Sequence, residues 1–219
     1  MKQLLAIAGL FIALSLQNIF ADDEFSQEYF AEGIDYELII PAVPTGLPSN
    51  KVQVLEMFWY GCPHCYRFEP FIEAWKAEGL PNYVELQQTP AILNPNWALH
   101  ARAYFAAEIL DVVDKIHGPF FHALHEKNKR LNTVDEIATF FKSHGVSKKD
   151  FHAAYNSFSV ATSLRKSLNL GRRFGLTGVP SIIINGKYRT AGLMAGDNKR
   201  MIEIIKFLAQ KEHDETMKK

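Results

Sequence analysis

The segment Cys62-Pro63-His64-Cys65 constrains this chain more than any other feature, because it holds the only two cysteines in 219 residues. Two thiols spaced two residues apart can form one local disulfide and no other. The segment follows an apolar run, residues 52–60, and precedes a pattern typical of a helix. Pro63 suits the first turn of that helix, where its missing N–H costs no hydrogen bond. A strand, then this cysteine pair, then a helix is the order that indicates a redox centre.

The first residues carry the pattern of an export signal. Met1 and Lys2 give a short basic start, residues 4–16 are apolar, and residues 17–21 lead to an expected cleavage before Asp22. A membrane anchor is the alternative, but the apolar run falls short of the roughly 20 residues that a spanning helix needs. We therefore expect residues 1–21 to be a cleaved signal peptide.

Composition is that of an ordinary globular chain. Hydrophobic residues make up 47% of it, which is enough for a core. The 24 basic residues balance the 24 acidic ones, so the charge gives no indication of nucleic-acid binding or of a charged membrane face. An exported chain meets oxidising conditions, in which stabilising disulfides accumulate. A bridge between Cys62 and Cys65 closes a loop too small to remove much chain entropy, which disfavours a purely structural role.

A metal site is disfavoured at both places where ligands gather. Two cysteines with only His64 nearby do not supply the four ligands of a structural zinc ion. His117, His122 and His125 lie close together in the sequence, but they lack an acidic partner at a known spacing, and we expect them on solvated helix faces. We expect no metal and no cofactor.

Strand and helix patterns divide the rest of the chain into three parts. The first has strands at 36–40, 52–59 and 83–87, with a helix from Pro63 to Gly79 whose buried stripe should hold Cys65 while Cys62 stays near solvent. The second, residues 90–158, has only helical patterns. Its expected helices cover 97–110, 120–129, 134–144 and 148–155. The third has a helix at 160–174, a hairpin turning at Asn185-Gly186, and a closing helix at 198–210.

The helix start gives the two sulfurs unequal chemistry. A thiolate, and not a thiol, attacks disulfides. Cys62 faces the N–H end of the helix, which favours negative charge, and a protonated His64 would add a positive neighbour. Each pKa unit by which the thiolate is favoured corresponds to about 1.4 kcal/mol, and this preference makes the disulfide a stronger oxidant. The alternative for His64 is a surface side chain that fills a gap.

Two further sites complete the set of candidates. Glu56 is the one carboxylate in an apolar strand; it is either a proton acceptor for Cys65, or a structural carboxylate with satisfied partners or a strand-end group near water. Val179-Pro180 introduces a strand after a glycine-containing turn. A cis proline there would present the backbone to an extended peptide, although the residues alone favour trans.

Together these motifs resemble the DsbA family of disulfide oxidases. The resemblance rests on Val54-Leu55-Glu56-Met57-Phe58, on Cys62-Pro63-His64-Cys65, and on Gly178-Val179-Pro180 followed by Ile184-Asn185-Gly186-Lys187-Tyr188. It implies an α/β, thioredoxin-like fold, a central mixed β-sheet flanked by helices, with an inserted all-helical domain. The domains implied are residues 22–89 with 159–219 for the thioredoxin-like part and residues 90–158 for the insertion.

The resemblance also implies an activity and partners. The chain would be a monomeric periplasmic oxidoreductase that donates its Cys62–Cys65 disulfide to reduced, unfolded exported proteins, and a DsbB-like, quinone-linked membrane oxidase would restore it. Pro63 and His64 would tune the disulfide, and a cis Pro180 would face it. In the family a Lys on the next strand often accompanies the carboxylate matching Glu56. Residues 82–86 hold no Lys here, so the charge partner of Glu56 stays open and its pKa is expected to be higher than in relatives.

Two other functions remain open at the level of sequence. A disulfide isomerase or reductase would share the cysteine pair, but isomerases of this compartment resemble dimers with an added domain, for which residues 22–50 are too short. A peptide-binding chaperone would use the apolar surface at Val179 and Pro180, with incidental cysteines.

Overall fold

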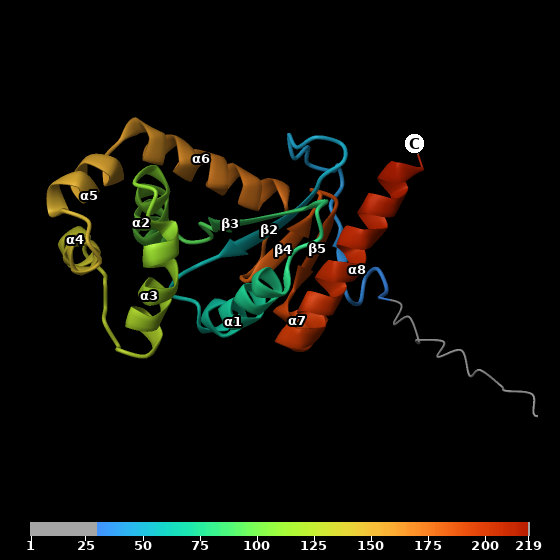
Figure 1. The fold of residues 1–219 in the computed structure, drawn as a ribbon, viewed down its shortest axis with the longest axis horizontal. Helices are drawn as coiled ribbons and strands as arrows, with labels where there is room; N and C mark the ends of the chain where they lie inside the picture. The colour runs from blue at the N-terminus through green and yellow to red at the C-terminus, as the bar shows by residue number, and fades with distance from the viewer. Residues whose placement is uncertain (1–29, 219) are drawn as a thin grey trace, which may run out of the picture.

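The computed structural model describes residues 30–218, which form a single five-stranded sheet with helices around it (Figure 1). The expected signal peptide, residues 1–21, lies outside the described residues. The strand order is β1-β5-β4-β2-β3, with β2 and β3 parallel and the other neighbours antiparallel, so the sheet is mixed. The strands are β1 (Glu37–Leu38), β2 (Val52–Phe58), β3 (Val84–Pro90), β4 (Ser181–Ile184) and β5 (Tyr188–Ala191).

The helices lie on both faces of the sheet and in a separate group beside it (Figure 1). None of those within residues 30–218 combines the length and apolar composition that a membrane span requires. In chain order they are α1 (Pro63–Glu78), α2 (Ala98–Ile109), α3 (Val113–His125), α4 (Val134–Ser143), α5 (Lys148–Tyr155), α6 (Phe158–Arg173), α7 (Gly192–Ala195) and α8 (Asn198–Met217), with a short 3₁₀ turn at Pro95–Trp97.

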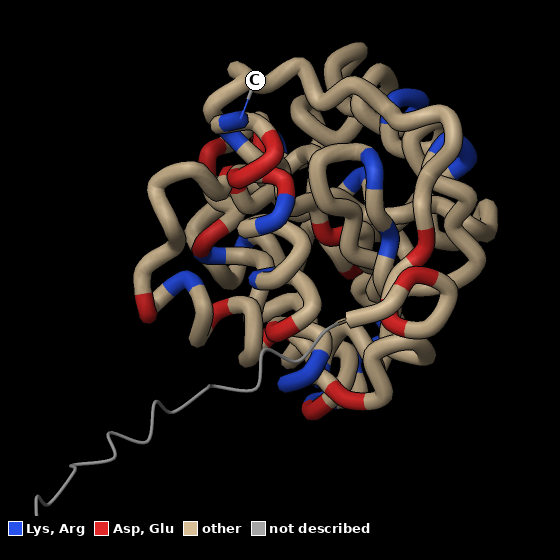
Figure 2. The backbone as a smooth tube through the Cα atoms, turned by 90° about the vertical axis from the view of Figure 1, so that its right-hand side faces the viewer, with Lys and Arg blue, Asp and Glu red and all other residues tan. Residues whose placement is uncertain are grey.

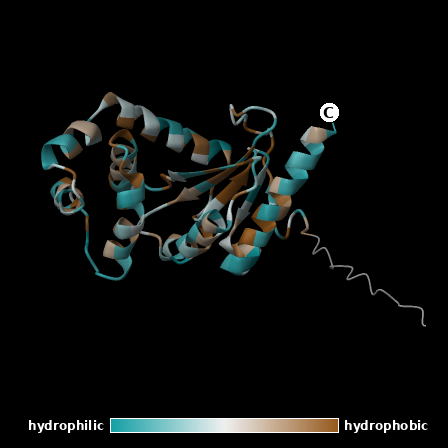
Figure 3. Cartoon of the chain, viewed as in Figure 1, coloured by the Kyte–Doolittle hydropathy of each residue, from teal (hydrophilic) through white to brown (hydrophobic). Residues whose placement is uncertain are grey.

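The central strand β2 is buried along its whole length, as its apolar sequence predicts. Alternate residues of the strand face opposite layers. Val54 joins a core with α1 and α8 on one face, and Leu55 joins a core with Phe174, the C-cap residue of α6, on the other. The apolar strand β4 is the brown strand in the middle of the sheet in Figure 3, whereas the more polar β3 is mostly teal. The cysteine pair follows the last residue of β2 and therefore lies at the end of the sheet where the parallel strands β2 and β3 finish.

Helices α2–α5 gather beside the sheet and share a core with the end of β2 (Figure 1). The expected capping box at Thr133 is present, because its hydroxyl accepts from the backbone of Glu136 and the Glu136 carboxylate accepts from the backbone of Thr133. Ser147 caps α5, also as expected. The large side chains that fill this core are Phe58, Tyr60, Phe120, Phe121, Phe141 and Phe151.

Helix α3 begins at Val113, seven residues before the expected start at 120. Gly118 and Pro119, which precede the expected start, lie inside the helix. A proline there removes one backbone hydrogen bond. The earlier turn also buries Ile116 and His117, and this added burial compensates for the lost bond.

Helix α8 runs to Met217, seven residues beyond the expected end at Gln210. The mixed charges of this tail suggested a solvated, fraying end. Glu212 is instead fully buried, where it accepts from Asn185 Nδ2 and pairs with Lys187 Nζ, each at 2.6 Å. The added turns therefore clamp the β4–β5 hairpin. Elsewhere basic and acidic positions are interspersed over the backbone (Figure 2), in keeping with the balanced composition.

Three smaller differences and one agreement concern the strands and the elements after them. β1 covers two residues of the five expected, β3 continues to Pro90, and the short α7 was not expected. The hairpin turn at Asn185-Gly186 is confirmed, with positive φ angles of 50° and 64° that Asn and Gly tolerate.

Candidate active site

The sulfur of Cys62 closes the first turn of α1. Cys62 is the N-cap residue, and its Sγ accepts a hydrogen bond from the backbone N–H of Cys65 at 3.4 Å. Pro63 occupies the first helical position, as expected. Both cysteines are thiols in this structure. Strand β2, the tight turn at residues 59–61 and helix α1 together hold the sulfur beyond the end of β2.

Cys62 is less exposed than the sequence suggested. Only 7% of its surface is accessible, because the loop before β4 covers it and the Cys62 thiol donates to the carbonyl oxygen of Val179 at 3.3 Å. The expectation that this residue lies open to solvent is therefore wrong. The order of the two sulfurs is as expected, since Cys65 is fully buried on the stripe that also holds Phe68, Ile72 and Trp75.

The two thiols have pKa values shifted in opposite directions. The pKa of Cys62 is lowered to about 6, first by the hydrogen bond from the Cys65 thiol, then by the backbone N–H groups of Cys65 and His64 and by the charge of His64, against the effect of burial. Burial raises the pKa of Cys65 far above its usual range, and the neighbouring Cys62 and Glu56 add to that effect. A single helical turn thus carries one stabilised thiolate and one strongly disfavoured one.

In the reduced protein, we expect Cys62 to react with iodoacetamide at a rate that rises with pH and is half-maximal near pH 6. Thiolate is present above this pH and is lost as the pH falls through it. Mass spectrometry of the alkylated peptide measures the rate for each cysteine. Cys65 serves as the internal control and should stay unmodified through neutral pH; equal labelling of both sulfurs would contradict the asymmetry.

His64 lies on the surface beside a second basic group. Its Nδ1 is 3.0 Å from the guanidinium of Arg67, one turn along α1. The backbone carbonyl of Arg67 in turn accepts from Asn198 Nδ2 at the start of α8. His64 is the basic side chain that acts on Cys62, and Arg67, which the sequence had not singled out, contacts His64.

The loop before β4 forms the opposite wall of the site. The peptide bond between Val179 and Pro180 is cis. Pro180 is buried and Val179 is half-buried, with its carbonyl against Cys62 as described. The tertiary structure thus brings this pair next to Cys62 across more than a hundred residues of chain.

Large aromatic side chains support the tight turn at residues 59–61 that leads to Cys62. Trp59 stacks on Trp97 with ring centroids 4.4 Å apart and planes within 5° of parallel. A side chain on Gly61 would collide with the Trp59 ring, so only glycine fits between the strand end and Cys62. Tyr60 is buried against Phe120 and Phe121.

Glu56 lies under the cysteine pair in the buried centre of the sheet. Burial, together with the nearby Glu69 carboxylate, raises its pKa to about 8, while a hydrogen bond from Gln88 lowers it. Gln88 Nε2 lies 2.8 Å from Glu56 Oε2, and Glu56 Oε1 has no hydrogen-bond partner. An uncharged amide, and not a Lys, stands beside the carboxyl group.

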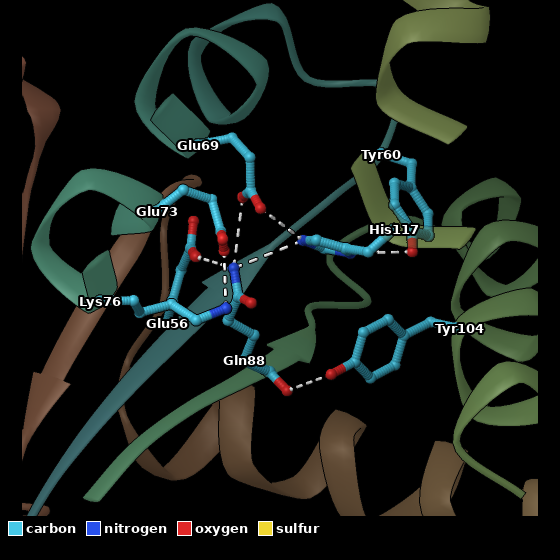
Figure 4. Close-up of polar contacts among 8 residues, drawn as sticks. All are labelled: Glu56, Tyr60, Glu69, Glu73, Lys76, Gln88, Tyr104 and His117. Atoms are coloured by element: carbon cyan, nitrogen blue, oxygen red, sulfur yellow. Dashed lines mark hydrogen bonds and ion pairs between the residues drawn. The ribbon is translucent and has the colours of Figure 1, made fainter. Parts of the chain in front are cut away.

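Four residues of this buried polar cluster were not found from the sequence (Figure 4). Gln88 on β3 is the register partner of Glu56, and it contacts Glu69 and His117 as well. A polar residue within the apolar stripe of α1 was the one available signal, and it marks Glu69. The four are Glu69, Gln88, Tyr104 and His117.

The three neighbouring histidines lie in different environments. His117 is 6% exposed and faces the polar cluster, so the expectation of a solvated helix face is wrong for it. His125 Nε2 donates to the backbone carbonyl oxygen of Tyr60 at 2.8 Å and its ring stacks on Tyr66, whereas His122 is exposed. Within residues 30–218, no three His, Cys, Asp or Glu side chains converge as a metal site would require.

The family and sequence comparisons point in one direction. Residues 72–209 match the model of the DSBA-like thioredoxin domain. The thiol:disulfide interchange protein DsbA of Azotobacter vinelandii is 36% identical over 196 residues, which cover 84% of this chain and 91% of the relative. The protein of the same name from Pseudomonas aeruginosa is 35% identical over 199 residues, covering 91% and 93%.

Solved structures give the same result. The crystal structure of Pseudomonas aeruginosa DsbA superimposes with a TM-score of 0.81 at 35% identity, covering 86% of this chain and 97% of that one. The oxidoreductase DsbA of Xylella fastidiosa gives 0.78 at 31% identity, covering 84% and 98%. The expected thioredoxin-like fold, a mixed sheet flanked by helices, is confirmed.

Proposed function

Because this chain belongs to the DsbA family and is a protein-disulfide oxidoreductase, we propose that it donates a Cys62–Cys65 disulfide to newly exported proteins. The observation that carries the proposal is the opposite shift of the two thiol pKa values within one helical turn. A stabilised thiolate lowers the free energy of the reduced dithiol form, and this makes the corresponding disulfide more oxidising.

The reaction proceeds by two exchanges. A substrate thiolate attacks Cys62 Sγ, the bond between Cys62 and Cys65 breaks, and its electron pair goes to Cys65 Sγ. A second substrate thiolate then attacks the substrate sulfur of the mixed disulfide, and Cys62 leaves as the stabilised thiolate. The substrate loses two electrons and gains a disulfide, and the enzyme gains them as a dithiol.

Glu56 supplies the proton in the first exchange. Burial makes a thiolate at Cys65 unfavourable, so this sulfur takes up a proton as it leaves. With a pKa of about 8, Glu56 is protonated at neutral pH and is therefore a donor in the oxidising direction. It becomes the acceptor that the sequence suggested only when the dithiol is reoxidised and Cys65 must lose its proton.

The remaining site residues hold the substrate and the reactive sulfur. Pro63 and His64 shape and charge the helix start around Cys62. Val179 and Pro180 form the wall against which an extended substrate segment binds, with backbone groups available for pairing. The contact between Cys62 and the Val179 carbonyl supports this placement, because it sets the sulfur directly beside that wall.

The proposed setting follows from the family and from the sequence of the first residues. Residues 1–21 direct the chain to the periplasm, where it acts as a monomer on reduced, unfolded proteins and not on nucleic acid. A DsbB-like, quinone-linked membrane oxidase restores the disulfide. Residues 90–158 form a helical domain inserted into a thioredoxin-like domain of residues 22–89 and 159–219.

Equilibration with glutathione tests the direction of the reaction. We expect the Cys62–Cys65 couple to settle at a potential clearly more oxidising than that of thioredoxin, which is about −270 mV. The fraction of dithiol is measured by mass spectrometry after acid quenching and alkylation, with thioredoxin in the same buffers as the reference. A potential at or below that of thioredoxin would mean that the protein acts as a reductase.

A further inference from the structure

Two buried carboxyl groups share one amide beneath the cysteine pair (Figure 4). Gln88 Nε2 lies 2.8 Å from Glu56 Oε2 and 3.2 Å from Glu69 Oε2. Glu56 is 1% exposed and Glu69 is 9% exposed. Two carboxylates this close in a buried site are unfavourable unless one is neutral or a cation lies between them. The group between them here is the neutral side chain of Gln88.

The elements around Glu56 bring no unpaired cation to it. α1 contributes Cys62, Cys65, Glu69, Glu73 and Lys76; Lys76 pairs with Glu73 at 2.7 Å. α2 contributes Tyr104, and α3 contributes His117. The register partner of Glu56 on β4 is Ile182, an apolar residue, and its register partner on β3 is Gln88. The hydrogen bond to Glu56 within the described chain therefore comes from an uncharged donor.

The two carboxyl groups differ in the number of donors that reach them. Tyr60 Oη lies 2.9 Å from His117 Nδ1, and with the hydroxyl as donor the His117 proton sits on Nε2, which is 3.2 Å from Glu69 Oε1. Glu69 thus accepts from His117 and from Gln88, whereas Glu56 accepts from Gln88 alone and its Oε1 is unpartnered. The carboxylate form of Glu56 is therefore stabilised by fewer hydrogen bonds, and its burial raises its pKa.

The helices beside the sheet fix Gln88 in this orientation. Tyr104 Oη on α2 donates to the backbone carbonyl of Gln88 at 2.8 Å, and His117 on α3 lies 3.4 Å from its side-chain Nε2. With its proton on Nε2, His117 donates to Glu69 and not to the amide, so the helical segment holds Gln88 through its backbone, while the two acceptors of its side-chain amide come from β2 and α1.

We infer that Gln88 is a positioning residue for the reaction: its uncharged amide binds the Glu56 carboxyl group without ionising it as a cation there would, so that Glu56 keeps a proton for Cys65, and Tyr104 holds the Gln88 backbone in place. The inference rests on the proposed role of Glu56. As Cys65 Sγ receives the electron pair of the broken disulfide, the proton passes from the Glu56 carboxyl group to that sulfur, and Glu56 is left as a carboxylate that is reprotonated from solvent. A lysine at position 88 would reverse the choice and favour the carboxylate of Glu56.

Two substitutions with effects of opposite sign test this. In Gln88→Lys, a cation beside Glu56 should lower the pH at which it titrates by about one to three units, the range typical of an adjacent opposite charge. In Gln88→Met, the loss of the lowering hydrogen bond should raise that pH. Titration of ¹³C-labelled glutamate carboxyl groups by NMR in the reduced protein, assigned with Glu56→Gln, measures both.

The matched control is Gln87→Lys. Gln87 is the register partner of Leu55, on the opposite face of the sheet, where it bonds to Gln53 at 2.8 Å. This variant adds the same charge one residue away and should leave the titration of Glu56 nearly unchanged. An equal shift in Gln87→Lys, or no shift in either folded variant of Gln88, would overturn the inference. Thermal unfolding establishes which variants are folded, and Gln88→Met supplies the test if Gln88→Lys is not.

The reaction itself gives a second readout. At neutral pH the single-turnover oxidation of a reduced test peptide by Gln88→Lys should slow by about two- to a hundredfold, following the smaller protonated fraction of Glu56. Gln87→Lys should react at the wild-type rate. If Gln88→Lys oxidises the peptide as fast as wild type although its Glu56 is ionised, Gln88 does not act on the reaction. Cys62 forms a mixed disulfide with glutathione disulfide without the help of Glu56. Loss of this mixed disulfide would therefore contradict the proposed function, and not the role of Gln88.

Discussion

Replacing Cys62 with Ser is expected to abolish the oxidation of a reduced test protein, with a loss of at least about a thousandfold, the scale on which removal of a catalytic nucleophile is felt. Cys62 has a stabilised thiolate at a helix start, whereas the other sulfur is buried and disfavours charge. Oxidation is followed by the appearance of active test protein or by the loss of its free thiols.

Cys65→Ser provides the matched control for this change. Neither single variant can hold the internal disulfide, so both should fail as oxidases. They should differ with glutathione disulfide: Cys65→Ser retains Cys62 and should form a mixed disulfide, seen as a gain of one glutathione by mass spectrometry. Cys62→Ser leaves only the fully buried Cys65 and should form little or none. Retained oxidation by Cys62→Ser, or equal trapping in both variants, would show that the roles of the two sulfurs are wrongly assigned.

Phe58→Ala is expected to cost about 3–5 kcal/mol of the free energy of unfolding, the range measured when a buried phenylalanine is truncated. Phe58 ends β2 and is fully buried. Its ring lies between the sheet and the helical segment. Four neighbouring rings have centroids 4.9–5.7 Å from that of Phe58: Tyr60, Tyr104, His117 and Phe121. The resulting cavity would adjoin the turn that leads to Cys62.

Denaturant unfolding of the wild type and the variant measures this cost, with both proteins in the same redox state. Phe158→Ala is the matched control, because the side chain at the start of α6 is 80% exposed and its loss should change stability by no more than about 0.5 kcal/mol. A cost below about 1.5 kcal/mol for Phe58→Ala, or equal costs for the two variants, would mean that this ring does not join the two parts of the molecule as the packing indicates.

Local patterns in the sequence were sufficient wherever neighbouring residues decide the structure. The apolar run of β2, Pro63 at the first position of α1 and the Asn185-Gly186 turn all lie where expected. The stripe that buries Cys65 was also predicted, because residues three and four apart share a face of a helix. These features depend on backbone preference and on the periodicity of apolar side chains, which a short window of sequence contains.

The partners of the buried groups could not be predicted in this way. Gln88 meets Glu56 only because β2 and β3 pair in a particular parallel register, and the whole of α1 separates these strands in the sequence. His117 reaches the same cluster because α3 begins earlier than its Gly-Pro sequence suggests. Long-range pairing of this kind leaves no periodic signal in either segment.

The sequence by itself determined that one helix start carries two unequal sulfurs, because capping, periodicity and the cysteine spacing are local properties, and its resemblance to the DsbA family implied the thioredoxin-like scaffold. The tertiary structure decided how unequal they are and what supports them. Val179 covers Cys62 from a distant loop, and the uncharged Gln88 binds Glu56, for which the sequence offered no Lys partner. Burial and charge depend on every element that packs around a group, and elements distant in sequence become neighbours only in the folded chain.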